Sequence, residues 1–309
     1  MTEMNRPSAK PTSVVALAAT LVVLLVCGSV TAVAAEPLAA PKDGKAKAAP
    51  EKPKKKKKRP PKQRPTYWGA WIGTQLTGDQ PPWDMSAVGR FSELAAKTPS
   101  LLEFAAPFAD CSTSPCSFYR FPRHEMETIR NFGAIPFFSW GSQSTPVPGD
   151  LNLPDYQLAD IAAGAHDDYI REFAEGARDW GHPFFLRFNW AKNGVNPQPW
   201  RSFDEIFDRS YRLITRKLAP TKPMLLAEMA SGGGARAKAK WIDEMFLQLR
   251  TKYRRIRGLI WFEQIDRGVQ WPIESSGAAT KAFRRGIRQP GFRTNHYSDL
   301  SGSPVPRPR

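Results

Sequence analysis

Apolar runs of strand length alternate with longer amphipathic runs of helix length through most of this chain, and this alternation limits its fold more than any other feature. Six runs have strand character, at 67–73, 100–109, 133–141, 183–188, 223–230 and 258–264. Helix-type runs lie between or after them, at 124–133, 156–181, 202–219, 235–256 and 280–289. Repeated strand-then-helix units with apolar strands predict an α/β domain over residues 66–290, either a doubly wound sheet or a barrel.

The first 35 residues have the pattern of a secretory signal peptide. A weakly basic start precedes the apolar stretch Val14–Val26, and Ala32 and Ala34 follow in cleavage-site spacing. The apolar stretch is shorter than the roughly 20 residues that span a bilayer, although its flanks leave an N-terminal anchor as the alternative. We therefore expect a secreted or cell-envelope-associated protein.

Residues 36–65 form a Lys/Pro-rich segment that we expect to be a disordered linker. It carries 12 Lys and Arg against 3 acidic residues, so it holds much of the formal net charge of +16. Behind a secretory signal, the tract Lys52–Arg64 favours contact with an anionic cell-wall polymer or a lipid surface over nucleic acid, which we do not expect as a partner. A solvated spacer is the alternative, and residues 291–309 are expected to form a loose tail.

Cys111 and Cys116 are the two cysteines that remain after removal of the signal segment. In an oxidising compartment they predict a small disulfide-closed loop, with two free thiols as the alternative.

Glu228 is the strongest candidate for a catalytic residue. It follows the apolar run Pro223–Ala227, which reads as a buried parallel strand, and small residues and glycines come after it. A carboxylate at the C-terminal end of such a strand points into the mouth where barrel enzymes build active sites, although a strand-end salt bridge is the simpler interpretation.

Four tryptophans lie at or close behind strand ends: Trp71, Trp140, Trp190 and Trp261. Gathered at one rim, aromatic faces stack on the C–H faces of sugar rings, so these residues predict substrate-binding positions. Each strand-end Trp taken alone is more typical of a core residue, and it is the gathering of four near one rim that favours the binding interpretation.

No cofactor or metal site is predicted. The four histidines are scattered, the cysteines lack ligand spacing, and Ser139 lacks a nucleophile elbow.

Several segments in order resemble glycoside hydrolase family 26, the secreted bacterial branch of β-mannanase-like (β/α)8 enzymes. They cover most of residues 66–290: WGAWIG (68–73), GAIPFFSWG (133–141), the stretch 156–188, RSFDEIF (201–207), KPMLLAEMAS (222–231) and WFEQIDRGVQWPIESS (261–276). The resemblance implies a TIM barrel, a β-linked mannan-type polysaccharide as substrate, and a retaining glycosidase in which Glu228 is the nucleophile.

The acid/base glutamate that the family carries after its fourth strand has no counterpart here. In FNWAKNGVNPQPW (188–200), Ala191 stands at that position. Only residues 189–222 separate the segments that resemble strands four and seven, whereas two more strand–helix units belong there. We therefore expect an incomplete barrel with about six of eight strands.

Loss of the acid predicts weak cleavage of unactivated substrates, because general acid–base help typically contributes 10²- to 10⁴-fold. Glu263 and Asp266 are the nearest candidates for a substitute acid, whereas Glu125 and Glu103 are more typical of a helix-surface charge and a strand-end charge. A non-catalytic carbohydrate-binding or wall-associated pseudo-enzyme is the main alternative. A decayed gene product whose shortened barrel folds poorly is a further one.

Overall fold

The computed structural model describes residues 65–145, 154–189, 208, 211–218 and 220–302. All of these belong to one compact unit, Arg59–Arg309. The expected signal segment and most of the expected linker lie outside the described residues. So do Trp190, Ala191, half of the expected helix 202–219, and the end of the tail.

Six parallel strands form one sheet whose order is β5-β4-β2-β1-β7-β6. The bounds of these strands are β1 Tyr67–Ile72, β2 Leu101–Asp110, β4 Ile135–Thr145, β5 Phe185–Phe188, β6 Met224–Met229 and β7 Ile256–Glu263. The last strand pairs with the first along its length, from Tyr67 opposite Gly258 to Ile72 opposite Glu263. Strands in chain order with the last beside the first are the arrangement of a (β/α)8 barrel rather than of a doubly wound sheet.

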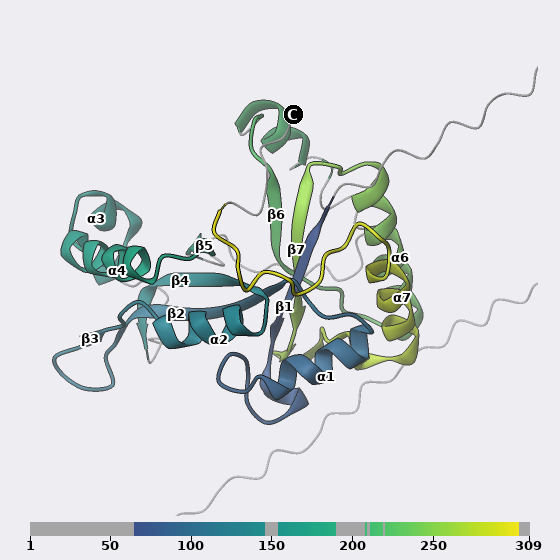
Figure 1. Cartoon of the computed structure of the whole chain (residues 1–309), viewed down its shortest axis with the longest axis horizontal. Coiled ribbons are helices and arrows are strands. Elements are labelled where there is room, and N and C mark those ends of the chain that lie inside the picture. Colours follow the sequence, from purple (N-terminus) through teal and green to yellow (C-terminus); the bar gives the residue numbers. More distant parts are fainter. Residues whose placement is uncertain (1–64, 146–153, 190–207, 209–210, 219, 303–309) are drawn as a thin grey trace, which may run out of the picture. The chain divides into compact units, whose positions relative to one another are not determined.

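Within the part of the chain that the structure describes, the sheet curls but does not close. Figure 1 shows β2 and β4 running nearly across the direction of β6 and β7. Within the described residues, β5 and β6 end the sheet and do not pair with each other. The expectation of an incomplete barrel with six strands is confirmed, and the break falls between the segments that correspond to strands four and seven.

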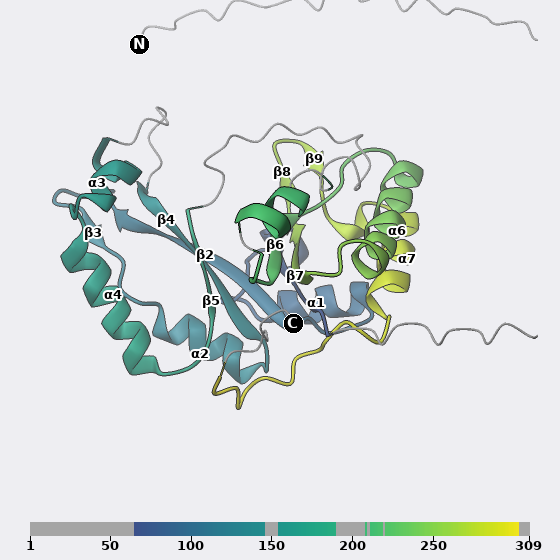
Figure 2. The same cartoon turned by 90° about the horizontal axis from the view of Figure 1, so that it is seen from above.

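Helices cover the outer face of the curled sheet (Figures 1 and 2). They are α1 Ser86–Ala95, α2 Arg123–Asn131, α3 Leu158–Ala162, α4 Asp167–Trp180, α6 Ala235–Thr251 and α7 Gly277–Ile287. The expected long helix 156–181 is divided into α3 and α4, where Gly164 has a φ of +98° that breaks the helix. Helix α1 was not predicted from the sequence.

Short elements complete the fold. They are the strands β3 Ser117–Phe118, β8 Ile265–Asp266 and β9 Val269–Gln270, the 3-10 turns η1 Thr74–Leu76, η2 Pro154–Tyr156 and η4 Ile273–Ser275, and the π-helical turn η3 Ile214–Leu218.

Alternate residues of each strand pack on opposite faces of the sheet and form two cores. The inner core is apolar at the N-terminal level of the strands and contains Tyr67, Leu101, Ile135, Phe137 and Ile260. The larger outer core lies between sheet and helices. The inside of the curl also carries polar side chains, among them Glu103, Ser139 and Arg187, which hydrogen-bond to one another.

Candidate functional site

Glu228 lies at the C-terminal end of β6, and its side chain points to the inside of the curl. The pairing of β6 with β7 shifts register between Leu226 and Met229, and Glu228 has a left-handed φ of +54°. A bulge of this kind re-aims a side chain. Leu226 and Met229 both pack in the outer core, while the Glu228 carboxylate meets Arg187 on the inner side.

Arg187 of β5 holds Glu228 across the open side of the sheet. Its Nη1 lies 3.0 Å from Glu228 Oε1, and its Nη2 donates to Glu228 Oε2 at 3.1 Å. The pair thus combines one charge-assisted hydrogen bond with a second close contact between opposite charges. These contacts fix the orientation of the Glu228 carboxylate.

Glu103 of β2 lies behind this pair and is almost completely buried, at 2% exposure. Its Oε1 accepts hydrogen bonds from Ser139 Oγ at 2.5 Å and from Arg187 Nη1 at 3.2 Å. The pKa of Glu103 is raised to about 7, mainly by burial; the hydrogen bond from Ser139 and the charge of Arg187 lower it, and the charge of Glu228 contributes to raising it.

The two carboxylates are close to each other. Glu103 Oε1 and Glu228 Oε1 contact the same Arg187 nitrogen at 3.2 and 3.0 Å. The sum of these distances limits their separation to about 6 Å, whereas the carboxyl pair of a retaining glycosidase is roughly 5–5.5 Å apart. The Glu103 side chain has no exposed surface, however, so a substrate held beside Glu228 does not reach it.

Trp71, at the C-terminal end of β1, also belongs to the inner side. It packs against the inner core, and its Nε1 donates to Gln264 Oε1 at 2.5 Å. The ring is half-buried, so part of it faces solvent. Of the three predicted tryptophans that the structure describes, this one lies where a substrate position was expected.

The structure corrects the expected rim positions of Trp140 and Trp261. Trp140 is 5% exposed and stacks on Phe173 of α4 with ring centroids 4.1 Å apart. Trp261 is 0% exposed and packs against Phe283 of α7. Both residues occupy helix-facing positions of their strands, so neither ring is available to stack on a sugar.

Apart from Glu103, the glutamates and the aspartate considered as substitute acids lie elsewhere. Glu263 ends β7 on the outer side and is completely buried; its Oε2 accepts from the Ile273 backbone, and burial, with Glu274 beside it, raises its pKa well above the usual range. Asp266 is in the β8–β9 hairpin beside Arg267, and Glu125 is in the first turn of α2. None of these three contacts the group formed by Glu103, Ser139, Arg187 and Glu228, which we call the Arg187 cluster.

Lys238 of α6 is a buried cation that supports the turn after β9. Its Nζ donates to the carbonyls of Gln270, Trp271 and Pro272 and to Ser275 Oγ, at 2.6–2.9 Å. Burial lowers the pKa of Lys238 to about 8, against the opposing effect of Glu263 and Glu274. We assign this group a structural role.

Cys111 and Cys116 form a disulfide, with an S–S distance of 2.07 Å and Cα atoms 4.3 Å apart. The loop that it closes connects β2 to β3.

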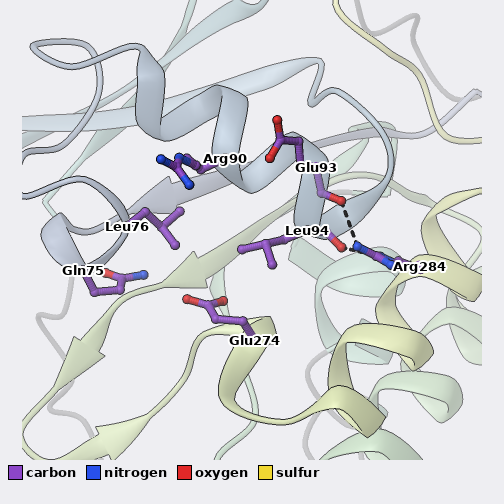
Figure 3. A pocket seen from close by; sticks show the side chains of 7 residues that line it. All are labelled: Gln75, Leu76, Arg90, Glu93, Leu94, Glu274 and Arg284. Carbon is purple, nitrogen blue, oxygen red and sulfur yellow. Dashed lines mark hydrogen bonds between the residues drawn. The ribbon is translucent and has the colours of Figure 1, made fainter.

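A cavity of about 480 Å³ lies in the helical layer, between α1, α7 and the turns η1 and η4. Figure 3 shows the side chains around it: Gln75, Leu76, Arg90, Glu93, Leu94, Glu274 and Arg284. It receives no side chain from β2, β5 or β6, so it is separate from the Arg187 cluster.

Across the described ranges there is no group of three or more His, Cys, Asp or Glu placed to hold a metal ion. In those same ranges, no helix is long and apolar enough to cross a bilayer.

The fold and the Arg187 cluster define an incomplete (β/α)8 barrel with an arginine-bridged pair of glutamates inside it. No family model matches the chain. A curated relative, endoglucanase H of Acetivibrio thermocellus, is 33% identical over 100 residues, which is 32% of this chain and 11% of the relative. The chain thus matches about a tenth of that protein's length.

Solved structures of mannanases are weakly similar. The Bacillus subtilis mannanase man26 has a TM-score of 0.43 at 11% identity, covering 76% of this chain and 88% of that one. A GH113 β-1,4-mannanase has a TM-score of 0.41 at 12% identity, covering 73% and 98%. A GH26 β-mannanase from Bacteroides ovatus has a TM-score of 0.37 at 10% identity, covering 75% and 91%. These TM-scores lie below 0.5. The order and pairing of the strands alone identify the fold as an incomplete (β/α)8 barrel.

Proposed function

We propose that this chain is a secreted glycoside hydrolase of family 26 type that acts on a β-linked polysaccharide of mannan type by a retaining mechanism. Glu228 is the nucleophile, and Trp71 is a sugar-stacking position. The observation that carries the proposal is the Glu228 carboxylate itself: it is turned inward at the C-terminal end of β6 and held by Arg187. The sequence resemblance supplies the family and the substrate class.

Glu228 would attack the anomeric carbon, and Arg187 would hold its carboxylate in place. The leaving group then departs without a proton donor. Ala191 occupies the acid/base position, and the Glu103 side chain is fully buried against Arg187. The rate should therefore depend strongly on the leaving group. Aryl β-glycosides with an acidic phenol should be cleaved, and mannan should be cleaved far more slowly.

The test compares an activated aryl β-mannoside with mannan on the full chain. Glu228→Gln should abolish cleavage of the aryl substrate, whereas Glu125→Gln, a glutamate on helix α2, should leave it unchanged. Equal activity of the Glu228→Gln variant would exclude Glu228 as nucleophile. Ala191→Glu should not restore strong mannan cleavage, since the missing barrel wall also carries substrate contacts.

A non-catalytic carbohydrate-binding protein is the second candidate. The complete burial of Glu103, the carboxylate closest to Glu228 in the Arg187 cluster, favours it. Binding of mannan oligosaccharides without turnover of even the activated aryl substrate would decide for this candidate.

We also propose that the N-terminal segment directs secretion and that Lys52–Arg64 contacts an anionic wall polymer or lipid surface. Mass spectrometry of the mature protein should show cleavage after the small-residue end of the first 35 residues. An intact N-terminus on protein recovered from the membrane fraction would contradict cleavage and favour the anchor.

A further inference from the structure

Glu103 is a charged residue in the middle of a buried strand, and only one of its oxygens is engaged. Oε1 accepts from Ser139 and Arg187. Oε2 is buried and has no hydrogen-bond partner among the described residues. A buried carboxylate oxygen without a donor is costly when ionised and much less so when it carries a proton.

Arg187 connects Glu103 to Glu228 through a single atom. Its Nη1 lies 3.2 Å from Glu103 Oε1 and 3.0 Å from Glu228 Oε1. Charges within a few ångströms interact strongly in an interior of reduced dielectric constant. A change of charge on Glu103 is therefore felt at Glu228, both directly and through the guanidinium that the two carboxylates share.

We propose that Glu103 is a positioning residue that sets, through Arg187, the charge balance around Glu228. When Glu103 carries a proton, the guanidinium charge serves Glu228 alone, and the cluster is neutral. When Glu103 is ionised, two carboxylates share one guanidinium, and the cluster is negative. The coupling stands on this geometry; its consequence for catalysis rests on the proposed function.

Glu103 changes its protonation state in the neutral pH range, because burial raises the pKa of Glu103 to about 7. The groups that act on it come from each strand that faces it: Ser139 from β4, Arg187 from β5 and Glu228 from β6. On the β1 side its register partner is Trp71, which does not titrate.

The test is an NMR titration of the full chain with isotope-labelled glutamate carboxyl carbons, in which Glu228→Gln assigns the Glu228 signal. In the wild type, this signal should shift in a step near pH 7 as Glu103 ionises. In Glu103→Gln the step should be absent. A wild type without the step, or a Glu103→Gln variant that keeps it, would overturn the proposal.

Ser139→Ala provides a second variant if Glu103→Gln does not fold. The Ser139 hydroxyl stabilises ionised Glu103, so its removal should move the step to higher pH. An unmoved step would count against the proposal. The titration needs no substrate, so absent turnover would contradict the proposed function alone. If aryl glycoside cleavage is found, Glu103→Gln should remove the same step from the pH profile of kcat while KM changes less than about twofold.

Discussion

Arg187 and Glu228 join the two strands that end the parallel sheet. Arg187 belongs to β5 and Glu228 to β6, and two guanidinium nitrogens meet two carboxylate oxygens at 3.0 and 3.1 Å. In a closed barrel, two further strands would lie between these positions. The ion pair therefore orients the candidate nucleophile and also connects the two edge strands, β5 and β6.

Arg187→Ala should destabilise the protein by about 3 kcal/mol, because it leaves the buried Glu103 and the half-buried Glu228 without their cation. Glu228→Gln should cost less, since the amide oxygen still accepts from Arg187. Urea unfolding of both variants measures this difference. A loss for Arg187→Ala no larger than that for Glu228→Gln would show that the pair does not hold the edges together.

Glu103 should make stability fall as pH rises. The folded state keeps the Glu103 proton up to about pH 7, whereas an unfolded glutamate loses it near 4.5, so the folded state binds more protons in this window. The stabilising effect is complete below pH 4.5 and is lost through pH 7. Between pH 4.5 and 8, wild type should lose about 3 kcal/mol relative to Glu103→Gln. Parallel pH dependence in the two proteins would contradict the raised pKa.

Trp71→Ala should weaken binding of mannan oligosaccharides about tenfold, because the half-buried ring at the strand end supplies stacking area. Trp83→Ala is the matched control, since Trp83 is 54% exposed and lies against the helix-facing side of Phe104. Calorimetric titration compares the two variants. Equal losses would remove Trp71 from the binding site.

Replacing both Cys111 and Cys116 by serine should cost about 2 kcal/mol, the loop-closure value for so short a loop. The melting temperature measures the effect, and the wild-type mass should be two hydrogens below the reduced form. A wild-type mass equal to the reduced form would contradict the disulfide.

Much of the fold could be predicted because each strand is a distinct apolar run. The missing units also followed from chain length, since the interval 189–222 is too short for two strand–helix pairs. Helix α1 escaped prediction: its sequence SAVGRFSELA contains Gly89 and only a short apolar stripe, and a packed helix face compensates for both.

The site was predicted less completely. Glu228 followed from its place after an apolar strand, but Trp140 and Trp261 were assigned to the wrong face. Strands buried on both sides show no polar alternation, so the sequence does not reveal which residues point inward. The sequence did contain an indication of the site. Glu103 and Arg187 are charged residues within otherwise apolar strands, and a buried charge requires a partner.

The central claim is that Glu228 is the nucleophile, and covalent trapping tests it most directly. Activated 2-deoxy-2-fluoro aryl glycosides of mannose and glucose slow the second step of a retaining mechanism, so the sugar stays on the nucleophile. Peptide mass spectrometry should find the added sugar on Glu228 in the wild type and on no peptide of Glu228→Gln. A label on a different residue, or no label although the substrate is turned over, would contradict the account.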